Sequence, residues 1–199
     1  MTRIFTADEI ARNAPAAAAR KSGAVHVCPL SEVPSLVADV KACRLVSLLQ
    51  AEIPVPTPKG IAASRHLRLE VHDISEPILD HVAPDTSHVR KLLRFAESWG
   101  GNGEMVVHCW AGISRSTAAA FTSLCLVNPD VPELVIARAL RAASPTAQPN
   151  RLIVQIADDL MGRKGRMLCA VEAMGPAVRA YAARPFSLSA DPVRLAKAN

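Results

Sequence analysis

Residues 106–117 form a segment whose residue types and spacing suit nucleophilic chemistry on a phosphate group. The segment reads Val-Val-His-Cys-Trp-Ala-Gly-Ile-Ser-Arg-Ser-Thr, so five residues separate Cys109 from Arg115. Residues 104–108 are short and apolar, which is typical of a buried strand, and residues 116–126 are alanine-rich, which is typical of a buried helix. A strand–loop–helix of this size turns successive backbone N–H groups inward. Together with the helix N-terminus, these groups form an anion site.

The glycine and the polar residues of this segment each have an expected role in binding phosphate or activating the cysteine. Gly112 allows the backbone to turn where a side chain would collide, and the planar fork of Arg115 can bind two phosphate oxygens. A helix N-terminus and a nearby cation lower a cysteine pKa, so we expect Cys109 to be a thiolate at neutral pH. His108 is expected to orient the loop through its backbone, and Ser116 to donate to the sulfur when phosphate leaves.

This segment resembles the signature of the cysteine-based protein tyrosine phosphatase superfamily, His-Cys-x-x-Gly-x-x-Arg-Ser/Thr, with no departure from it. The size of the chain and the Ser-Arg-Ser ending are similar to the dual-specificity-like branch, in a prokaryotic-looking form, over residues 24–162. The resemblance implies that Cys109 is the nucleophile of a cysteinyl-phosphate intermediate and that Arg115 binds phosphate and stabilises the transition state. It also implies an enzyme without metal or other cofactor. The phosphate would be cradled by the amides of Trp110, Ala111, Gly112, Ile113, Ser114 and Arg115.

The family also uses an aspartate as general acid on a loop some thirty-odd residues before the cysteine, and three aspartates are candidates. Asp73 directly follows residues 66–71, whose alternation of apolar and polar residues predicts a strand. It lies 36 positions before Cys109. Asp80 lies in a connecting loop, and Asp85 precedes a helical run, where it is better explained as a helix cap. Asp73 is therefore preferred, and a bell-shaped pH profile with an acidic optimum is expected.

A second loop of the family, a Pro-Asn element before a helix, matches Pro149 and Asn150, with Gln155 further on. Asn150 or Gln155 would position water or pack against the phosphate loop. The alternative is that Pro149 and Asn150 only begin a helix, and the sequence does not choose between these interpretations.

Composition predicts one α/β domain of 199 residues with 50% hydrophobic content. Predicted strands alternate with predicted helices, which indicates a central mixed, mostly parallel sheet of four to five strands with helices on both faces. We expect residues 1–22 to be an arm or a first strand and helix, 23–165 the catalytic domain, and 166–199 a C-terminal helix and tail packed on the same domain. The expected strands are 24–28, 44–49, 66–71 and 104–108, and the expected helices 31–41, 86–99, 116–126, 132–143, 150–161 and 166–181.

Charge and cysteine content restrict the setting and the partners. The net charge of +5 suits anionic substrates, but the chain has no basic run or aromatic platform, so no nucleic-acid partner is expected. Five cysteines without a CxxC pair indicate a reducing compartment, and no apolar stretch suits a membrane span, so a cytoplasmic location is expected. Cys28 or Cys43 is a candidate to protect Cys109 from over-oxidation through a disulfide.

The expected substrate is a phosphorylated protein or peptide, with tyrosine and dual specificity both open. No charged residue lies between Cys109 and Arg115, which argues against a polyphosphorylated lipid. Trp110 either lines the pocket rim or packs beneath the loop. The competing interpretations are a phosphatase of other phosphate esters, a sulfurtransferase, and a catalytically weak phospho-binding module. The sequence carries no indication of the oligomeric state.

Overall fold

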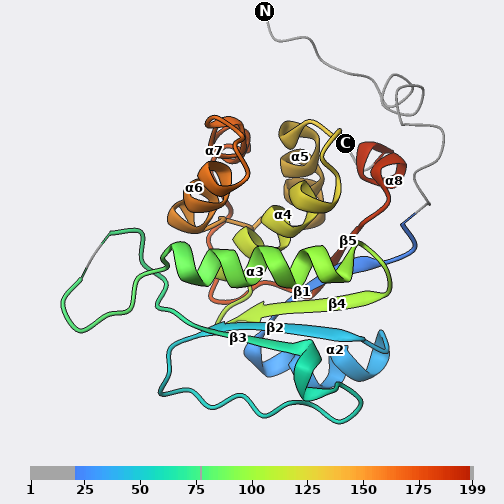
Figure 1. The fold of residues 1–199 in the computed structure, drawn as a ribbon, viewed down its shortest axis with the longest axis vertical. Helices are drawn as coiled ribbons and strands as arrows, with labels where there is room; N and C mark the ends of the chain where they lie inside the picture. Colours follow the sequence, from blue (N-terminus) through green and yellow to red (C-terminus); the bar gives the residue numbers. More distant parts are fainter. Residues whose placement is uncertain (1–20, 77, 198–199) are drawn as a thin grey trace, which may run out of the picture.

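The computed structural model describes residues 21–76 and 78–197 and is built around a five-stranded sheet in the order β3-β2-β4-β1-β5 (Figure 1). Four strands run parallel, and β5 pairs antiparallel with β1 at one edge. The strands are β1 (Ala24–Pro29), β2 (Arg44–Leu49), β3 (His66–Glu70), β4 (Glu104–Cys109) and β5 (Phe186–Ser189). The expected mixed, mostly parallel sheet is confirmed.

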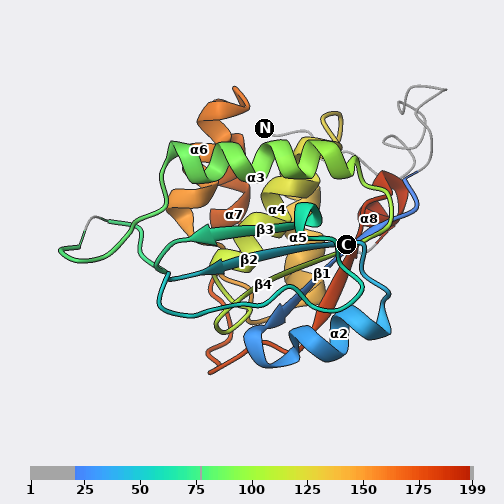
Figure 2. The ribbon, with the colours of Figure 1, turned by 60° about the horizontal axis from the view of Figure 1, so that its bottom comes forward.

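Helices cover both faces of this sheet, although unequally (Figures 1 and 2). The short helix α2 (Val33–Asp39) lies on one face, where it closes a small apolar cluster with β1 and β2. The larger core lies on the other face. The helices packed there are α3 (Thr86–Trp99), α4 (Arg115–Val127), α5 (Glu133–Ala143), α6 (Arg151–Leu160), α7 (Arg166–Glu172) and α8 (Pro192–Lys197).

The central position of β4 and α4 follows from their residues. Five residues of β4, from Met105 to Cys109, are buried, as expected for the middle strand of a sheet covered on both faces. In α4 the small side chains of residues 118–120 are fully buried, which allows α3, α5 and α6 to pack closely around it. The helix that begins at Arg115 is therefore held rigidly against the sheet.

Local capping signals fix the ends of the flanking helices. The side chain of Asp85 accepts hydrogen bonds from the backbone N–H groups of Ser87 and His88 and so caps α3, as the sequence predicted. Gly100 ends the same helix with a φ of 62°. At α7 the buried carboxylate of Asp158 accepts from the N–H groups of Gly165 and Met167.

The C-terminal part of the chain differs from the expectation. The predicted helix over residues 166–181 is wrong in its length, because α7 ends at Glu172, just before Gly175 and Pro176. The chain then runs extended to β5 and α8, two elements that the sequence analysis did not foresee. The arm or first strand and helix predicted for residues 1–22 lies, up to residue 20, outside the described residues. Within the described ranges, no helix is long and apolar enough to cross a bilayer.

Candidate active site

The loop that joins β4 to α4 is held by its carbonyl groups, which face outward. The carbonyl of Trp110 accepts from the Leu30 amide at 3.1 Å, and that of Ala111 from the Ala183 amide at 2.8 Å. Ile113 and Ser114 accept in the same way from the amides of the segment before α6, at 2.9 and 3.2 Å. Throughout the described residues, no recorded hydrogen bond uses an amide of residues 110–114. The loop therefore keeps its donors available for an anion.

Gly112 is necessary for this loop. Its φ of +72° is left-handed, and a Cβ placed there would lie 2.8 Å from the Cys28 carbonyl carbon and from the Pro29 nitrogen. The close approach of the loop to the end of β1 thus requires a residue without a side chain.

The sulfur of Cys109 lies at the base of the loop, almost completely buried. The Ser116 hydroxyl is 3.2 Å from it, as the spacing of the two residues predicted. Arg115 is 4% exposed and donates one Nη to the Val71 carbonyl at 2.8 Å. Its Nε is buried and has no hydrogen-bond partner. A buried guanidinium N–H without a partner is costly, so it indicates a place for an acceptor from outside the protein.

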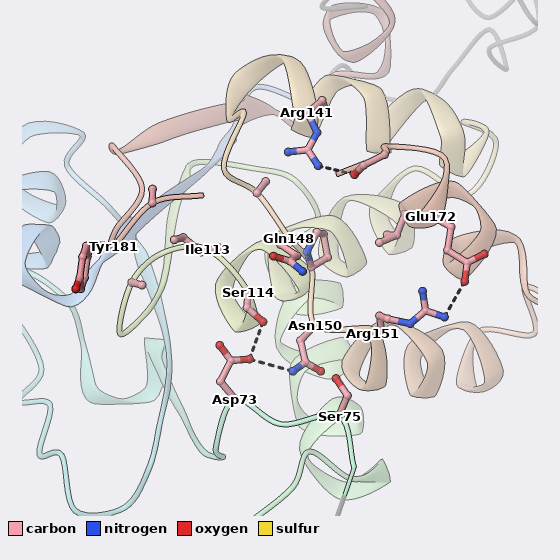
Figure 3. A pocket seen from close by; sticks show the side chains of 16 residues that line it. Asp73, Ser75, Ile113, Ser114, Arg141, Gln148, Asn150, Arg151, Glu172 and Tyr181 are labelled. Atoms are coloured by element: carbon pink, nitrogen blue, oxygen red, sulfur yellow. Dashed lines mark hydrogen bonds and ion pairs between the residues drawn. The ribbon is translucent and has the colours of Figure 1, made fainter. Parts of the chain in front are cut away.

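Asp73 lies beside this guanidinium, on the loop that follows β3. Its carboxylate accepts from the Ser114 hydroxyl at 2.6 Å and from the Asn150 amide at 3.1 Å, and it is 3.8 Å from the Arg115 Nε (Figure 3). Asn150 also donates to the Ile74 carbonyl. Because β3 and β4 are parallel strands of one sheet, their carboxyl ends bring the two loops to the same edge.

Asn150 begins α6 and also lies against the phosphate loop, where its backbone N–H donates to the Ser114 carbonyl. Its side-chain oxygen caps α6 by accepting from the Ile153 amide, while its side-chain nitrogen holds Asp73. Gln155 is exposed on α6 and does not line the cavity. Of the other candidate acids, Asp85 caps α3, and Asp80 is exposed in a loop and lines none of the cavities beside the phosphate loop.

His108 is fully buried behind Cys109. Its Nε2 lies 2.6 Å from the Ser47 hydroxyl, and its Nδ1 lies 3.4 Å from the Cys109 carbonyl oxygen. Burial lowers the pKa of His108 to about 4, with a further lowering by the Arg115 charge, so the ring is neutral at ordinary pH.

The expected protection of Cys109 by a disulfide is not supported by the geometry. Cys43 contacts Glu104 at the opposite end of β4, five residues or roughly 16 Å from Cys109. Cys28 packs among the residues beneath α2, whereas Cys109 belongs to the core on the other face of the sheet. Burial and the nearby Cys109 raise the pKa of Cys28 to about 12, which also disfavours its reaction.

Two adjoining cavities meet at the phosphate loop. The smaller, of about 430 Å³, is bordered by Gln50 and Ile53 from the loop after β2, together with Asp73, Trp110, Ala111 and Arg115. The larger, of about 760 Å³, extends from Asp73 and Ala111 to Arg151 and Tyr181 (Figure 3). Trp110 is 59% exposed, so it lies at the rim and does not pack beneath the loop.

The cations that line the larger cavity contact protein groups, although the Nε of Arg141 is buried without a hydrogen-bond partner. Arg141 donates to the carbonyls of Pro145 and Gly175, and Arg151 pairs with Glu172 (Figure 3). Among the described residues, no group of three or more His, Cys, Asp or Glu side chains is arranged to hold a metal ion.

Comparison with solved structures identifies the fold. The chain is similar to a crystal structure of DUSP15, with a TM-score of 0.55 and 21% identity, over 76% of this chain and 94% of that one. It is also similar to a crystal structure of PTPMT1, with a TM-score of 0.50 and 22% identity, over 71% and 94% of the two chains. The fold is that of the protein tyrosine phosphatases. No family model matches the chain, and no curated protein does.

Sequence reasoning missed some residues that surround the site. Ala183, whose amide supports the phosphate loop, lies in a segment that was expected to follow a helix. Ser47, which contacts His108, carried a usable signal: it is a polar residue in the otherwise apolar strand Arg44–Leu49, and its strand neighbours in the sheet are residues of β3 and β4.

Proposed function

We propose that this protein is a phosphatase of the protein tyrosine phosphatase type, which hydrolyses phosphate monoesters through a cysteinyl-phosphate intermediate. The observation that carries the proposal is the buried Nε of Arg115, which has no hydrogen-bond partner and only a long ion pair, at 3.8 Å, with the Asp73 carboxylate. With the free amides of the loop and the sulfur of Cys109, it forms a donor-lined site with a nucleophile at its base. A phosphate dianion supplies the acceptors that this site lacks.

The proposed reaction has two steps. The thiolate of Cys109 attacks phosphorus, so an S–P bond forms while the bond from phosphorus to the leaving oxygen breaks. Asp73, protonated, gives its proton to that oxygen. Asp73 then accepts a proton from water, whose oxygen attacks phosphorus, and the S–P electron pair returns to sulfur. Ser116 stabilises the departing thiolate, from which its hydroxyl is 3.2 Å away.

The proposed substrate is a phosphorylated protein or peptide. Two large apolar side chains that are exposed in the described part of the chain line the two cavities: Trp110 on the phosphate loop and Tyr181 on the C-terminal segment. Ile78, Leu79 and Val82 are also exposed and lie further along the loop that carries Asp73. An apolar rim of this kind favours contact with a large partner. Arg151 pairs with Glu172, so that cation is not available to a second phosphate on the substrate.

The test is hydrolysis of p-nitrophenyl phosphate in the presence of a metal chelator, from about pH 4 to about pH 8. Cys109→Ser is expected to abolish activity. Asp73→Asn, which keeps the size of the side chain, is expected to lower kcat by about 10²-fold and to remove the basic limb of the pH profile. Arg151→Lys, on the same cavity wall but outside the phosphate loop, is the matched control and should retain activity.

The outcomes also separate the competing functions. Binding of vanadate without turnover by the wild type would replace the enzyme with a phospho-binding module. Transfer of sulfur from thiosulfate to cyanide by Cys109 would favour a sulfurtransferase. If Tyr181→Ser lowers kcat/KM for a phosphotyrosine peptide but not for p-nitrophenyl phosphate, the protein substrate is supported. An equal effect on both would contradict it.

A further inference from the structure

Behind the phosphate loop, polar side chains from three strands and one loop form a continuous chain of hydrogen bonds. Arg68 Nη2 lies 2.7 Å from Thr57 Oγ1, which lies 3.0 Å from His66 Nδ1. His66 Nε2 is 2.8 Å from Ser47 Oγ, which is 2.6 Å from His108 Nε2. The last link joins His108 Nδ1 to the Cys109 carbonyl oxygen at 3.4 Å. The chain thus begins at an exposed arginine and ends at the backbone of the nucleophile.

The chemistry of the two ends gives this chain a single direction. A guanidinium only donates and a carbonyl only accepts. Arg68 therefore donates to Thr57, and neutral His108 donates its one N–H, from Nδ1, to the Cys109 carbonyl. His108 Nε2 must then accept, so Ser47 donates its only hydroxyl hydrogen to it and accepts from His66 Nε2. His66 Nδ1 is then the acceptor of the Thr57 hydroxyl hydrogen.

Both rings are in the neutral state that this direction requires. Burial, and secondarily the charge of Arg68, lower the pKa of His66 to about 4. Burial lowers the pKa of His108 to about 4; the hydrogen bond to the Cys109 carbonyl opposes this shift, and the charge of Arg115 adds to it. The ionisable groups that act on the two rings are Arg68 and His108 on His66, and Arg115 on His108.

The last link bears on the geometry of the phosphate site. In a planar trans peptide, the carbonyl of Cys109 and the N–H of Trp110 point in opposite directions. When His108 holds the carbonyl toward the sheet, the Trp110 amide is directed into the loop, where it is the first of the phosphate donors. The orientation of the His108 ring therefore determines the orientation of a catalytic donor.

We propose that Ser47 and His66 are positioning residues of this site, which fix the Nδ1-protonated tautomer of His108 and thereby the peptide between Cys109 and Trp110. This inference rests on the proposed phosphatase function for its effect on turnover. Its effect on the tautomer and on anion binding is independent of turnover.

The first test is nitrogen NMR of the histidine side chains in the resting protein near pH 7. The expected result is opposite tautomers, with the hydrogen of His66 on Nε2 and that of His108 on Nδ1. A wild-type His108 protonated on Nε2, or protonated on both nitrogens, would overturn the proposal.

The second test compares Ser47→Ala with Ser123→Ala. Both changes remove a buried hydroxyl, but the Ser123 hydroxyl has no hydrogen-bond partner, so its loss breaks no chain. We expect Ser47→Ala to mix the tautomers of His108, to lower kcat about tenfold with little change in KM, and to weaken binding of inorganic phosphate. Ser123→Ala should change none of these. Equal kcat and phosphate affinity in the two variants would refute the role of Ser47.

His66 is tested by His66→Gln and His66→Leu. The terminal amide of glutamine can place an N–H near the position of Nε2, so His66→Gln should retain more activity than His66→Leu and keep His108 in one tautomer. If both variants lose activity equally while His108 keeps its tautomer, His66 is only structural. A wild type without activity at any pH would contradict the proposed phosphatase function. The histidine tautomers and the phosphate affinity would still decide whether Ser47 and His66 position His108.

Discussion

The guanidinium of Arg115 is fixed by the protein at one nitrogen and is available to an anion at another. One Nη donates to the Val71 carbonyl, next to the loop that carries Asp73, and the Nε has no hydrogen-bond partner. The fixed nitrogen places the plane of the fork before any anion binds, so binding requires little further ordering of the side chain. At the residue scale, the contact with Val71 orients Arg115 and leaves its Nε available to an anion.

Asn150 has two tasks that substitution can separate. Asn150→Ser keeps an N-cap oxygen for α6 but cannot reach Asp73, whereas Asn150→Ala loses both contacts. We expect both variants to lower kcat for p-nitrophenyl phosphate, because Asp73 loses its amide donor. Only Asn150→Ala should also lose about 1 kcal/mol of unfolding free energy, measured in urea. Equal stability of the two variants would show that the cap is unimportant, and full activity of Asn150→Ser would show that Asp73 does not need the amide.

Gly112 and Gly162 have similar left-handed backbones but different surroundings. At Gly112 a Cβ would lie 2.8 Å from backbone atoms of Cys28 and Pro29, whereas at Gly162 nothing lies within 4 Å. We expect Gly112→Ala to abolish activity and vanadate binding. Gly162→Ala should cost about 1 kcal/mol of stability through backbone strain and retain activity. If Gly112→Ala still binds vanadate, the close approach of the loop to β1 is not essential.

At the scale of elements, the strands and helices that precede residue 166 follow from short-range signals. Apolar runs predict the buried strands, and Asp85 and Gly100 mark the two ends of α3. The later elements do not have such signals. β5 is a four-residue edge strand without a strong apolar pattern, and its pairing with β1 depends on contacts distant in sequence.

The candidate site, like the fold, was predictable from the sequence only where short-range signals determine it. The spacing from His108 to Ser116 indicates the phosphate loop, and the strand before Asp73 indicates the second loop at the same sheet edge. The hydrogen-bonded chain of side chains through Ser47 and His66 could not be derived from the sequence, because it depends on the register of three strands. Register is a tertiary property that a local sequence pattern does not determine.

The C-terminal segment is expected to act on the phosphate loop through one backbone hydrogen bond. Ala183→Pro removes the N–H that donates to the Ala111 carbonyl. We expect a several-fold lower kcat and weaker vanadate binding, because that part of the loop loses its outer anchor. Ala182→Pro is the matched control, since no recorded hydrogen bond uses its amide. Comparable activities of the two variants would show that the anchor does not contribute.

At the scale of the whole molecule, the active-site edge of the sheet differs from the rest of the surface. The loops after β2, β3 and β4 and the C-terminal segment converge on the two adjoining cavities. Two of the exposed large apolar side chains, Trp110 and Tyr181, line these cavities. The fold thus places a small donor-lined loop at the base of two wider cavities, an arrangement that suits the proposed phosphatase function.

Buried ionisable groups of the fold should give its stability a maximum near neutral pH. The pKa of His108 falls from an ordinary 6.5 to about 4 in the folded protein. Between these values the unfolded chain binds a proton that the folded protein does not, so stability decreases as the pH falls, by at most about 1.4 kcal/mol per pH unit for this residue. His66 acts in the same direction.

Buried thiols cause the decrease in stability on the alkaline side of this maximum. The pKa of Cys28 rises from an ordinary 9.0 to about 12, and that of Cys125 is also raised, in both cases mainly by burial. Above about pH 9 the unfolded thiols ionise while the folded ones stay protonated, so stability decreases as the pH rises. Urea unfolding from about pH 5 to about pH 10 should therefore give a maximum between about pH 7 and pH 8.5. His66→Gln should flatten only the acid limb, and Cys28→Ala only the alkaline limb. A wild-type midpoint that is constant from pH 7 to pH 5 would mean that the two histidines are not held neutral, which would also remove the basis for the tautomer that directs Trp110.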